Sequence, residues 1–198
     1  MDLPDLDPDP HAQFDRWFEE AAAAGVRHPN QMALATAAHD AMPSVRMVLL
    51  KGHDARGFVF YTNRSSRKAA ELEANPRAAA TLHWERQDRQ VRIEGTVEPV
   101  SDDESLAYFR TRPRDSRVSA WASPQSRTVT SRHELELRVA EIERRFAGRE
   151  EVPLPPFWGG YRIVATAIEF WQGQPNRLHD RLSYELSDGV WSRERLAP

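Results

Sequence analysis

Hydrophobic residues near the N-terminus recur every three or four positions, which predicts a helix with one buried aromatic stripe. The stripe consists of Phe14, Trp17, Phe18 and Ala21. Asp9 and Pro10 are typical of an N-cap and a first helical position, and Gly25 is typical of a helix end. We therefore expect a first helix between Pro10 and Gly25, packed against a core.

Further along, short runs of β-branched and aromatic residues predict strands instead. The expected strands are residues 31–38, 45–51, 58–62, 77–85, 90–100, 161–171, 181–185 and 190–195. Loops at 53–57 and 86–89 connect two predicted hairpins. A short helix is expected at 65–74, and capping boxes that begin at Ser101 and Ser131 predict two more helices.

The order of these elements indicates the fold class. Strands surround a few short helices without regular βαβ alternation, so we predict an α+β fold built on an antiparallel barrel. Residues 1–10 are rich in Asp and Pro and are expected to form a disordered, solvated acidic arm. Residues 11–198 are expected to form a single domain.

Composition narrows the class of protein. The 198 residues include no cysteine, which excludes disulfide frameworks. Their net charge of −3 argues against broad nucleic-acid binding. No apolar run approaches the roughly 18 residues of a membrane span, and no secretory signal is evident. The histidines lack metal-ligand spacing, so no metal is expected. We expect a cytoplasmic protein that binds neither nucleic acid nor membrane.

Lysine is rare in this chain. Of 27 Lys and Arg residues, only Lys51 and Lys68 are lysines. Arg67 and Lys68 follow two serines in the first turn of a predicted helix, where cations are unfavourable unless they face an anion. This pattern favours an anion site, although an ordinary serine cap followed by exposed cations gives the same sequence.

Other cations gather in short motifs. On a strand, Arg177, His179 and Arg181 would project to one side and favour a phosphate or carboxylate, or else form a solvated surface row. Arg46 and Lys51 would face opposite sides of a regular strand, so a bulge or a curved strand is needed for both to reach one ligand. Together with a segment around Arg112, these motifs indicate one or two phosphorylated aromatic ligands.

Several of these stretches, in order, resemble the pyridoxamine 5′-phosphate oxidase family. The similarity extends from about residue 13 to the C-terminus. The matching motifs are RMVLLK at 46–51, FVFYTN at 58–63, SSRKA at 65–69, RQV at 89–91, YFRTRPRDS at 108–116, QS at 125–126, VPLPPFWGG at 152–160, FWQG at 170–173, RLHDR at 177–181 and RLAP at 195–198.

The resemblance implies a split β-barrel homodimer with peripheral helices and an FMN site at the subunit interface. The residues implied to hold FMN are Arg46, Met47, Val48, Leu49, Leu50, Lys51, Tyr61, Thr62, Arg67, Lys68, Gln90, Gln125, Ser126, Trp171 and Arg181. The residues implied to bind substrate are Lys51, Tyr108, Arg112, Ser116, Arg177 and His179. Arg177 and His179 are implied to orient the substrate ring over the flavin.

The reaction implied is oxidation of pyridoxine or pyridoxamine 5′-phosphate to pyridoxal 5′-phosphate by dioxygen, which yields hydrogen peroxide. Two alternatives stay open: an FMN oxidase of the phenazine pathway, and a flavin- or vitamer-phosphate-binding module without turnover. The set Lys51, Tyr108, Arg112 and Ser116 disfavours the phenazine alternative. The acidic arm replaces a basic, tyrosine-containing segment that covers bound substrate in many members, so those covering contacts are expected to be absent.

Overall fold

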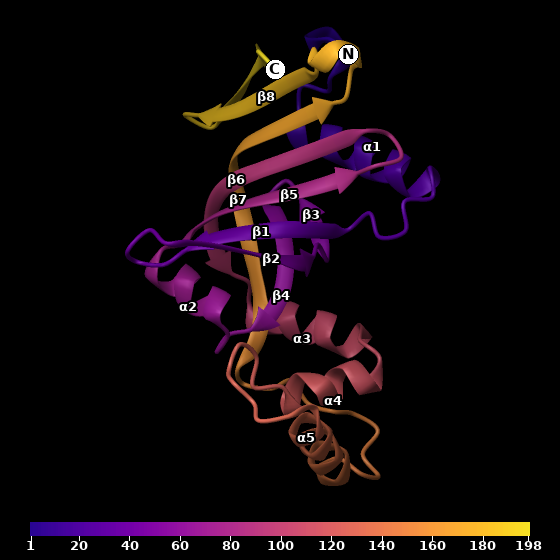
Figure 1. The fold of residues 1–198 in the computed structure, drawn as a ribbon, viewed down its shortest axis with the longest axis vertical. Coiled ribbons are helices and arrows are strands. Elements are labelled where there is room, and N and C mark those ends of the chain that lie inside the picture. The colour runs from indigo at the N-terminus through magenta and orange to yellow at the C-terminus, as the bar shows by residue number, and fades with distance from the viewer.

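Nine strands form one antiparallel sheet that curls on itself (Figure 1). The computed structural model describes residues 1–198. The strands are β1 Gln31–Ala37, β2 Pro43–Leu49, β3 Gly52–Asp54, β4 Gly57–Asn63, β5 Arg77–Trp84, β6 Arg89–Pro99, β7 Trp158–Gln172, β8 Asp180–Ser187 and β9 Val190–Leu196. Their order is β2-β1-β5-β6-β7-β4-β3, and β8 and β9 extend from β7. The predicted α+β class with an antiparallel barrel-like sheet is confirmed.

Five α-helices surround the sheet. They are α1 Pro10–Ala23, α2 Arg67–Ala74, α3 Asp102–Thr111, α4 Arg114–Ala122 and α5 Arg132–Arg145. The predicted caps are present, because the side chains of Asp9, Ser101 and Ser131 accept hydrogen bonds from backbone N–H groups of the first turns. Helix α4 was not predicted; Pro113 ends α3 and is also the N-cap of α4, since its fixed φ fits a helix start.

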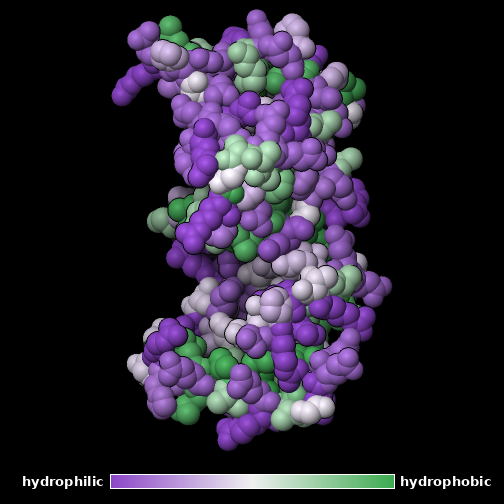
Figure 2. Space-filling view, turned by 90° about the vertical axis from the view of Figure 1, so that its right-hand side faces the viewer, coloured by the Kyte–Doolittle hydropathy of each residue, from purple (hydrophilic) through white to green (hydrophobic).

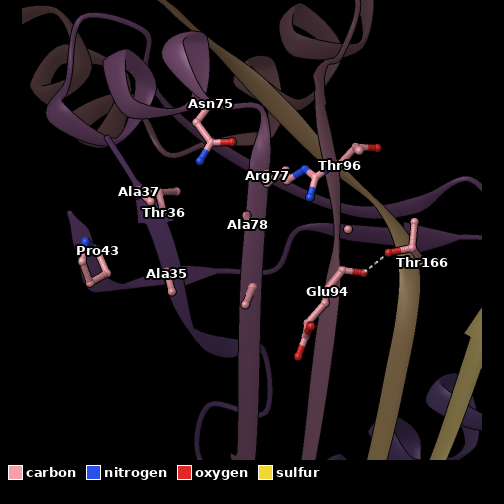
Figure 3. Close-up of a pocket in the computed structure, with 12 residues that line it drawn as sticks. Ala35, Thr36, Ala37, Pro43, Asn75, Arg77, Ala78, Glu94, Thr96 and Thr166 are labelled. Carbon is pink, nitrogen blue, oxygen red and sulfur yellow. Dashed lines mark hydrogen bonds between the residues drawn. The ribbon is translucent and has the colours of Figure 1, made fainter. Parts of the chain in front are cut away.

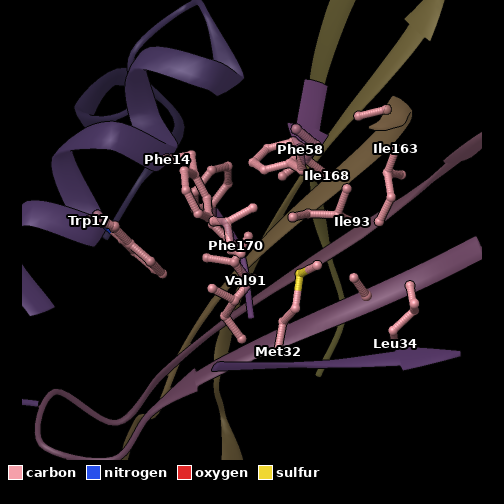
Figure 4. Close-up of a cluster of buried hydrophobic side chains, with 14 of the residues drawn as sticks. Phe14, Trp17, Met32, Leu34, Phe58, Val91, Ile93, Ile163, Ile168 and Phe170 are labelled. Carbon is pink, nitrogen blue, oxygen red and sulfur yellow. The ribbon is translucent and has the colours of Figure 1, made fainter. Parts of the chain in front are cut away.

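The main core fills the curled sheet and is covered by α1 (Figure 4). Phe14 and Trp17 of α1 are buried, as the aromatic stripe predicts. The Trp17 ring meets Phe170 edge-on at 5.2 Å between centroids, and Phe14 meets Phe58 at 4.9 Å. Packing of α1 onto β4 and β7 therefore seals one end of the sheet and leaves the other end to helices α3 to α5 (Figure 1).

The predicted hairpin between residues 45–51 and 58–62 is wrong in its pairing. Strand β2 pairs with β1 along its whole length, and the hairpin partner of β4 is the short β3. The chain leaves β2 after Leu49; the Lys51 N–H then donates to the Val59 carbonyl at 2.8 Å, where the chain joins β4. Long-range pairing with β1 thus overrides the local hairpin signal.

The N-terminal segment differs from the expected solvated arm. It contains a short 3₁₀ helix, Leu3–Asp5, and its Leu6 side chain is buried. Arg193 of β9 donates to the Leu6 carbonyl at 3.0 Å, and the Tyr184 hydroxyl of β8 donates to the Asp7 carbonyl at 2.6 Å. The arm lies against β8 and β9 because their side chains satisfy its carbonyls. Each helix of the chain is too short or too polar to span a membrane.

Candidate functional site

Most of the predicted site residues line one cleft with a volume of about 440 Å³, here called the cationic cleft. Its predicted members are Arg46, Met47, Val48, Leu49, Lys51, Tyr61, Thr62, Lys68, Tyr108, Arg112, Ser116 and Gln125, and Pro113 and Trp158 join them. These residues come from β2 and the segment after it, β4, the N-terminus of α2, helices α3 and α4 and their junction, the loop after α4, and the start of β7. The structure therefore brings together segments far apart in sequence, and it also brings Arg46 and Lys51 to the same cleft.

Arg46 and Lys51 share the cleft because the chain departs from β2 between them. Arg46 is in the strand, whereas Lys51 follows its end. Leu50 turns the other way into the core and is 3% exposed. Arg67 and Ser126 also lie outside the cleft lining. Their side chains are exposed, and they are the sequence neighbours of Lys68 and Gln125, which line the cleft.

Arg46 is held by a carboxylate that the sequence analysis missed. Its guanidinium donates to Glu71 at 2.9 Å and to Thr36 Oγ1 at 2.5 Å. Glu71, on α2, also accepts from Ser44 at 2.6 Å and from Arg67 Nε at 2.7 Å. Burial raises the pKa of Glu71, but these hydrogen bonds outweigh burial and lower it to about 2. The only signal in the sequence was the i,i+4 spacing of Arg67 and Glu71.

Lys68 is a buried cation with neutral partners. Its ammonium donates to Thr62 Oγ1 and Gln125 Oε1, both at 3.0 Å, and to Ser66 Oγ at 3.4 Å, and it has no carboxylate in an ion pair. Burial, and then the nearby Arg46 charge, lower the pKa of Lys68 to about 8. A phosphate in the cleft would supply the missing negative charge, which fits an anionic cofactor or substrate.

The opposite wall of the cleft is aromatic and carries a second cation. The Tyr61 ring stacks on Tyr108 at 4.1 Å and on Trp158 at 5.4 Å between centroids. The Arg112 guanidinium lies 4.9 Å above the Trp158 ring, and its Nη1 is buried without a hydrogen-bond partner. Burial lowers the pKa of Arg112 from its ordinary value. An unpartnered guanidinium nitrogen at a cleft wall fits a second anion.

The remaining predicted residues form a separate group, here called the C-terminal cluster: Gln90, Trp171, Arg177, His179 and Arg181. Gln90 and Arg181 flank Trp171 in register on β6 and β8. The His179 ring lies 4.7 Å from the Trp171 ring. Arg181 binds Glu169 through two hydrogen bonds of 2.9 and 3.0 Å.

We predicted that Arg177, His179 and Arg181 lie on one strand and project to one side. This prediction is wrong for Arg177 and His179, which lie before the strand. Strand β8 begins at Asp180, and residues Pro175–Arg177 form a 3₁₀ turn. Asn176 and Arg177 have φ values of 60° and 62°, so the chain reverses there. Arg177 is exposed and forms no hydrogen bond or ion pair within the chain.

Strand β7 runs from the side of helices α3 and α4 to the side of β8 (Figure 1). Trp158 lines the cleft, and Trp171 is at the far end of the same strand. At about 3.3 Å per residue the strand path between them is roughly 40 Å. The two groups of residues therefore do not form one site within a single chain.

Another hollow, of about 450 Å³, lies on the outer side of the sheet at a bulge between Glu94 and Gly95 (Figure 3). Small side chains, several of them alanines, line much of it together with Arg77 and Glu94. It contains none of the predicted site residues. Exposed hydrophobic side chains interrupt the hydrophilic surface (Figure 2), and those of β2 include Val45, Met47 and Leu49.

Comparison with known proteins identifies the family. Residues 18–146 match the profile of the family described as pyridoxamine 5′-phosphate oxidase. Residues 158–198 match the pyridoxine 5′-phosphate oxidase C-terminal dimerisation region. The chain belongs to the pyridoxamine 5′-phosphate oxidase family.

Individual relatives are similar over nearly the whole chain. A pyridoxine/pyridoxamine 5′-phosphate oxidase from Rubrobacter xylanophilus is 60% identical over 97% of this chain and 88% of its own. One from Cupriavidus taiwanensis is 58% identical over 98% and 91%. Among solved structures, PhzG from Burkholderia lata, in complex with tetrahydrophenazine-1-carboxylic acid, has a TM-score of 0.93 and 32% identity, covering 98% of this chain and 95% of its own. An FMN-binding protein from Nostoc punctiforme, with a TM-score of 0.75 and 16% identity over 94% of this chain and 96% of its own, shares the fold.

Proposed function

We propose that this protein oxidises pyridoxine 5′-phosphate and pyridoxamine 5′-phosphate to pyridoxal 5′-phosphate, with FMN as cofactor and dioxygen as electron acceptor. The observation that carries the proposal is that two cations of the cationic cleft, Lys68 and Arg112, have no anionic partner within the chain. Buried Lys68 lacks a carboxylate partner, and Arg112 has a buried nitrogen without a hydrogen bond. FMN and a vitamin B6 phosphate each bring one phosphate group, so two anions match two cationic places.

The residues around Lys68 suit the cofactor phosphate. Lys68 and Arg46 supply charge, Thr62 and Gln125 supply polar atoms, and Glu71 keeps the Arg46 guanidinium in place. Helix α2 also points its N-terminus toward this region, which favours an anion. The exposed residues of β2 next to Arg46 offer backbone and apolar contacts to the rest of the cofactor.

The residues around Arg112 suit the substrate phosphate. Arg112, Lys51, Tyr108 and Ser116 line the same cleft as Lys68, with Lys51 Nζ 5.9 Å from the Tyr108 ring centroid. A charge-assisted contact with a phosphate contributes about 1.5–3 kcal/mol. The tetrahydrophenazine acid bound by the PhzG relative carries a carboxylate and no phosphate, so these four residues favour a phosphorylated substrate.

The C-terminal cluster completes the site only from a second copy of the chain. The roughly 40 Å strand path along β7 separates it from the cationic cleft. The match to a dimerisation region and the exposed hydrophobic residues of β2 support a two-fold homodimer in which each cleft receives the partner copy's cluster. Two equal sites per dimer follow from this symmetry.

FMN, when bound, would supply the redox chemistry: a two-electron oxidation of the substrate at C4′, with dioxygen as the final acceptor, reduced to hydrogen peroxide. The protein's own groups bind and orient. In this proposal Arg177, which is exposed and unpartnered in the single chain, and His179, which packs beside Trp171, would hold the substrate ring. Gln90, Trp171 and Arg181 would hold the cofactor. With pyridoxamine 5′-phosphate, water then hydrolyses the imine to the aldehyde and ammonia.

The test is an anaerobic absorption spectrum of the purified protein reconstituted with FMN. Pyridoxine 5′-phosphate should bleach the flavin band, admitted oxygen should restore it, and unphosphorylated pyridoxine should act far more weakly. An Arg112→Ala variant should retain FMN and lose most of the preference for the phosphorylated substrate. A protein that binds FMN but is not bleached is a binding module, and one bleached only by tetrahydrophenazine-1-carboxylic acid, the molecule bound by PhzG, supports the phenazine alternative.

A further inference from the structure

The turn between β7 and β8 is held in an unfavourable backbone conformation. Asn176 and Arg177 both have left-handed φ values, which side chains with a Cβ rarely adopt, and neither is a glycine. Such a conformation persists only where surrounding contacts fix it. The contacts at this turn come from Gln174 and Asp180, which flank it.

Gln174 and Asp180 form a short hydrogen-bonded chain that reaches His179. The Gln174 backbone N–H donates to His179 Nδ1 at 3.1 Å. The Gln174 side-chain amide donates to Asp180 Oδ2 at 2.7 Å. Arg195 of β9 donates to Asp180 Oδ1 at 2.7 Å and, through its second nitrogen, to Asp2 Oδ1 at 3.0 Å. Both oxygens of Asp180 are thus engaged.

The bond at Nδ1 has a chemical consequence for His179. A ring nitrogen that accepts a backbone N–H carries no proton, so the proton of the neutral ring lies on Nε2. The lone pair of Nδ1 accepts the hydrogen bond from Gln174, and Nε2 carries the ring proton and therefore has no free lone pair. A neutral His179 in this arrangement can donate a hydrogen bond from Nε2, but it has no free lone pair with which to accept a proton.

We propose that Gln174 and Asp180 are positioning residues that hold His179 as its Nε2–H tautomer, so that His179 donates a hydrogen bond to the substrate and is not the general base. The tautomer rests on the contacts of this turn alone, whereas the role toward substrate rests on the proposed function. The Trp171 ring packs against the His179 ring at an angle of 38°, the Gln174 backbone N–H holds Nδ1, and Asp180 ties Gln174 to Arg195 of β9. Asp2 of the N-terminal acidic arm accepts a hydrogen bond from the same Arg195 and so helps to hold it in place.

Nitrogen NMR of the FMN-bound protein tests the tautomer without any turnover. With ¹⁵N-labelled histidine, and His179 assigned through a His179→Gln variant, the parent should show an unprotonated Nδ1 and a protonated Nε2 at neutral pH. Gln174→Ala and Asp180→Asn should give a mixture of tautomers. A protonated Nδ1 in the parent, or parent-like spectra in both variants, would overturn the proposal.

Kinetics test the consequence for substrate. Asp180→Asn should lower kcat/KM for pyridoxine 5′-phosphate about tenfold, the value of roughly one hydrogen bond, with FMN affinity unchanged. Asp180→Glu, which restores the charge, should recover part of the loss. The matched control is Asp188→Asn, in the exposed β8–β9 turn, which should leave spectrum and turnover unchanged. Parent-like turnover in Asp180→Asn with a mixed tautomer would overturn the role of the tautomer. A parent without oxidase activity would instead refute the proposed function, and the NMR result would still decide the tautomer.

Discussion

Replacing Lys68 by Met should make the FMN-free protein more stable and FMN binding weaker. Lys68 is 8% exposed, and its ammonium is surrounded by neutral oxygens from Thr62, Ser66 and Gln125. Methionine is similar in length and brings no charge into this place. The substitution therefore separates the free-energy cost of the buried ammonium charge from the packing of the methylene groups of the lysine side chain.

The magnitude follows from the pKa. Burial lowers the pKa of Lys68 from 10.5 to about 8, and one pKa unit corresponds to about 1.4 kcal/mol, so holding the charged form costs the fold about 3 kcal/mol at pH 7. Loss of the lysine hydrogen bonds offsets part of this gain. We expect an increase of about 1–2 kcal/mol in the free energy of unfolding of the FMN-free variant. FMN affinity should fall by about 1–3 kcal/mol, because a charge-assisted phosphate contact is lost.

The sign of the pH dependence provides a second check. Between pH 8 and 10.5 the unfolded lysine binds its proton while the folded one has released it, so the stability of the FMN-free parent gains from Lys68 as pH rises through this window. The variant should lack this gain. Urea unfolding of the FMN-free proteins at pH 7 and pH 10, and fluorescence titration with FMN, measure the two effects.

The matched control is Lys51→Met, because Lys51 is the other lysine and is exposed. It should leave the stability of the FMN-free protein near that of the parent. A Lys68→Met protein that is less stable without FMN and binds FMN as tightly as the parent would refute the reasoning. Lys68 would then be a structural cation with adequate partners of its own.

Three further predictions concern other parts of the site. Glu71→Gln should weaken FMN binding and lower the free energy of unfolding at pH 7. Because the pKa of Glu71 in the folded protein is about 2, the greater stability of the parent should be present above pH 4.5 and should disappear as pH falls toward 2. Urea unfolding across this pH range measures the difference. Arg177→Ala should lower kcat/KM about tenfold or more with FMN retention unchanged, and equal losses of both would assign Arg177 to the cofactor. Light scattering should give the mass of a homodimer for the parent. Met47→Asp, on the exposed face of β2, should yield monomers that bind FMN poorly. A parent that is a stable monomer and still binds FMN tightly would contradict the shared site.

Local sequence determined most of the helices and strands of this protein. The caps at Asp9, Ser101 and Ser131 and the alternating runs of the strands act over a few residues, so their effect is visible without the fold. The motif around Arg112 indicated a place for an anion, which stays a prediction. Glu71 was missed because its main partners, Thr36 and Ser44, lie far away in sequence.

Only the tertiary structure decided how these pieces meet. Pairing of β2 with β1 along its length sends Leu50 into the core and Lys51 into the cleft, a choice that alternation along one strand cannot predict. Contacts with β8 and β9 order an N-terminal segment whose composition favours disorder. The 15-residue β7 holds Trp158 of the cationic cleft at one end and Trp171 of the C-terminal cluster near the other, so under the proposed function a complete site takes residues from two chains. Such separations depend on long-range pairing, whereas sequence patterns report only neighbours along the chain.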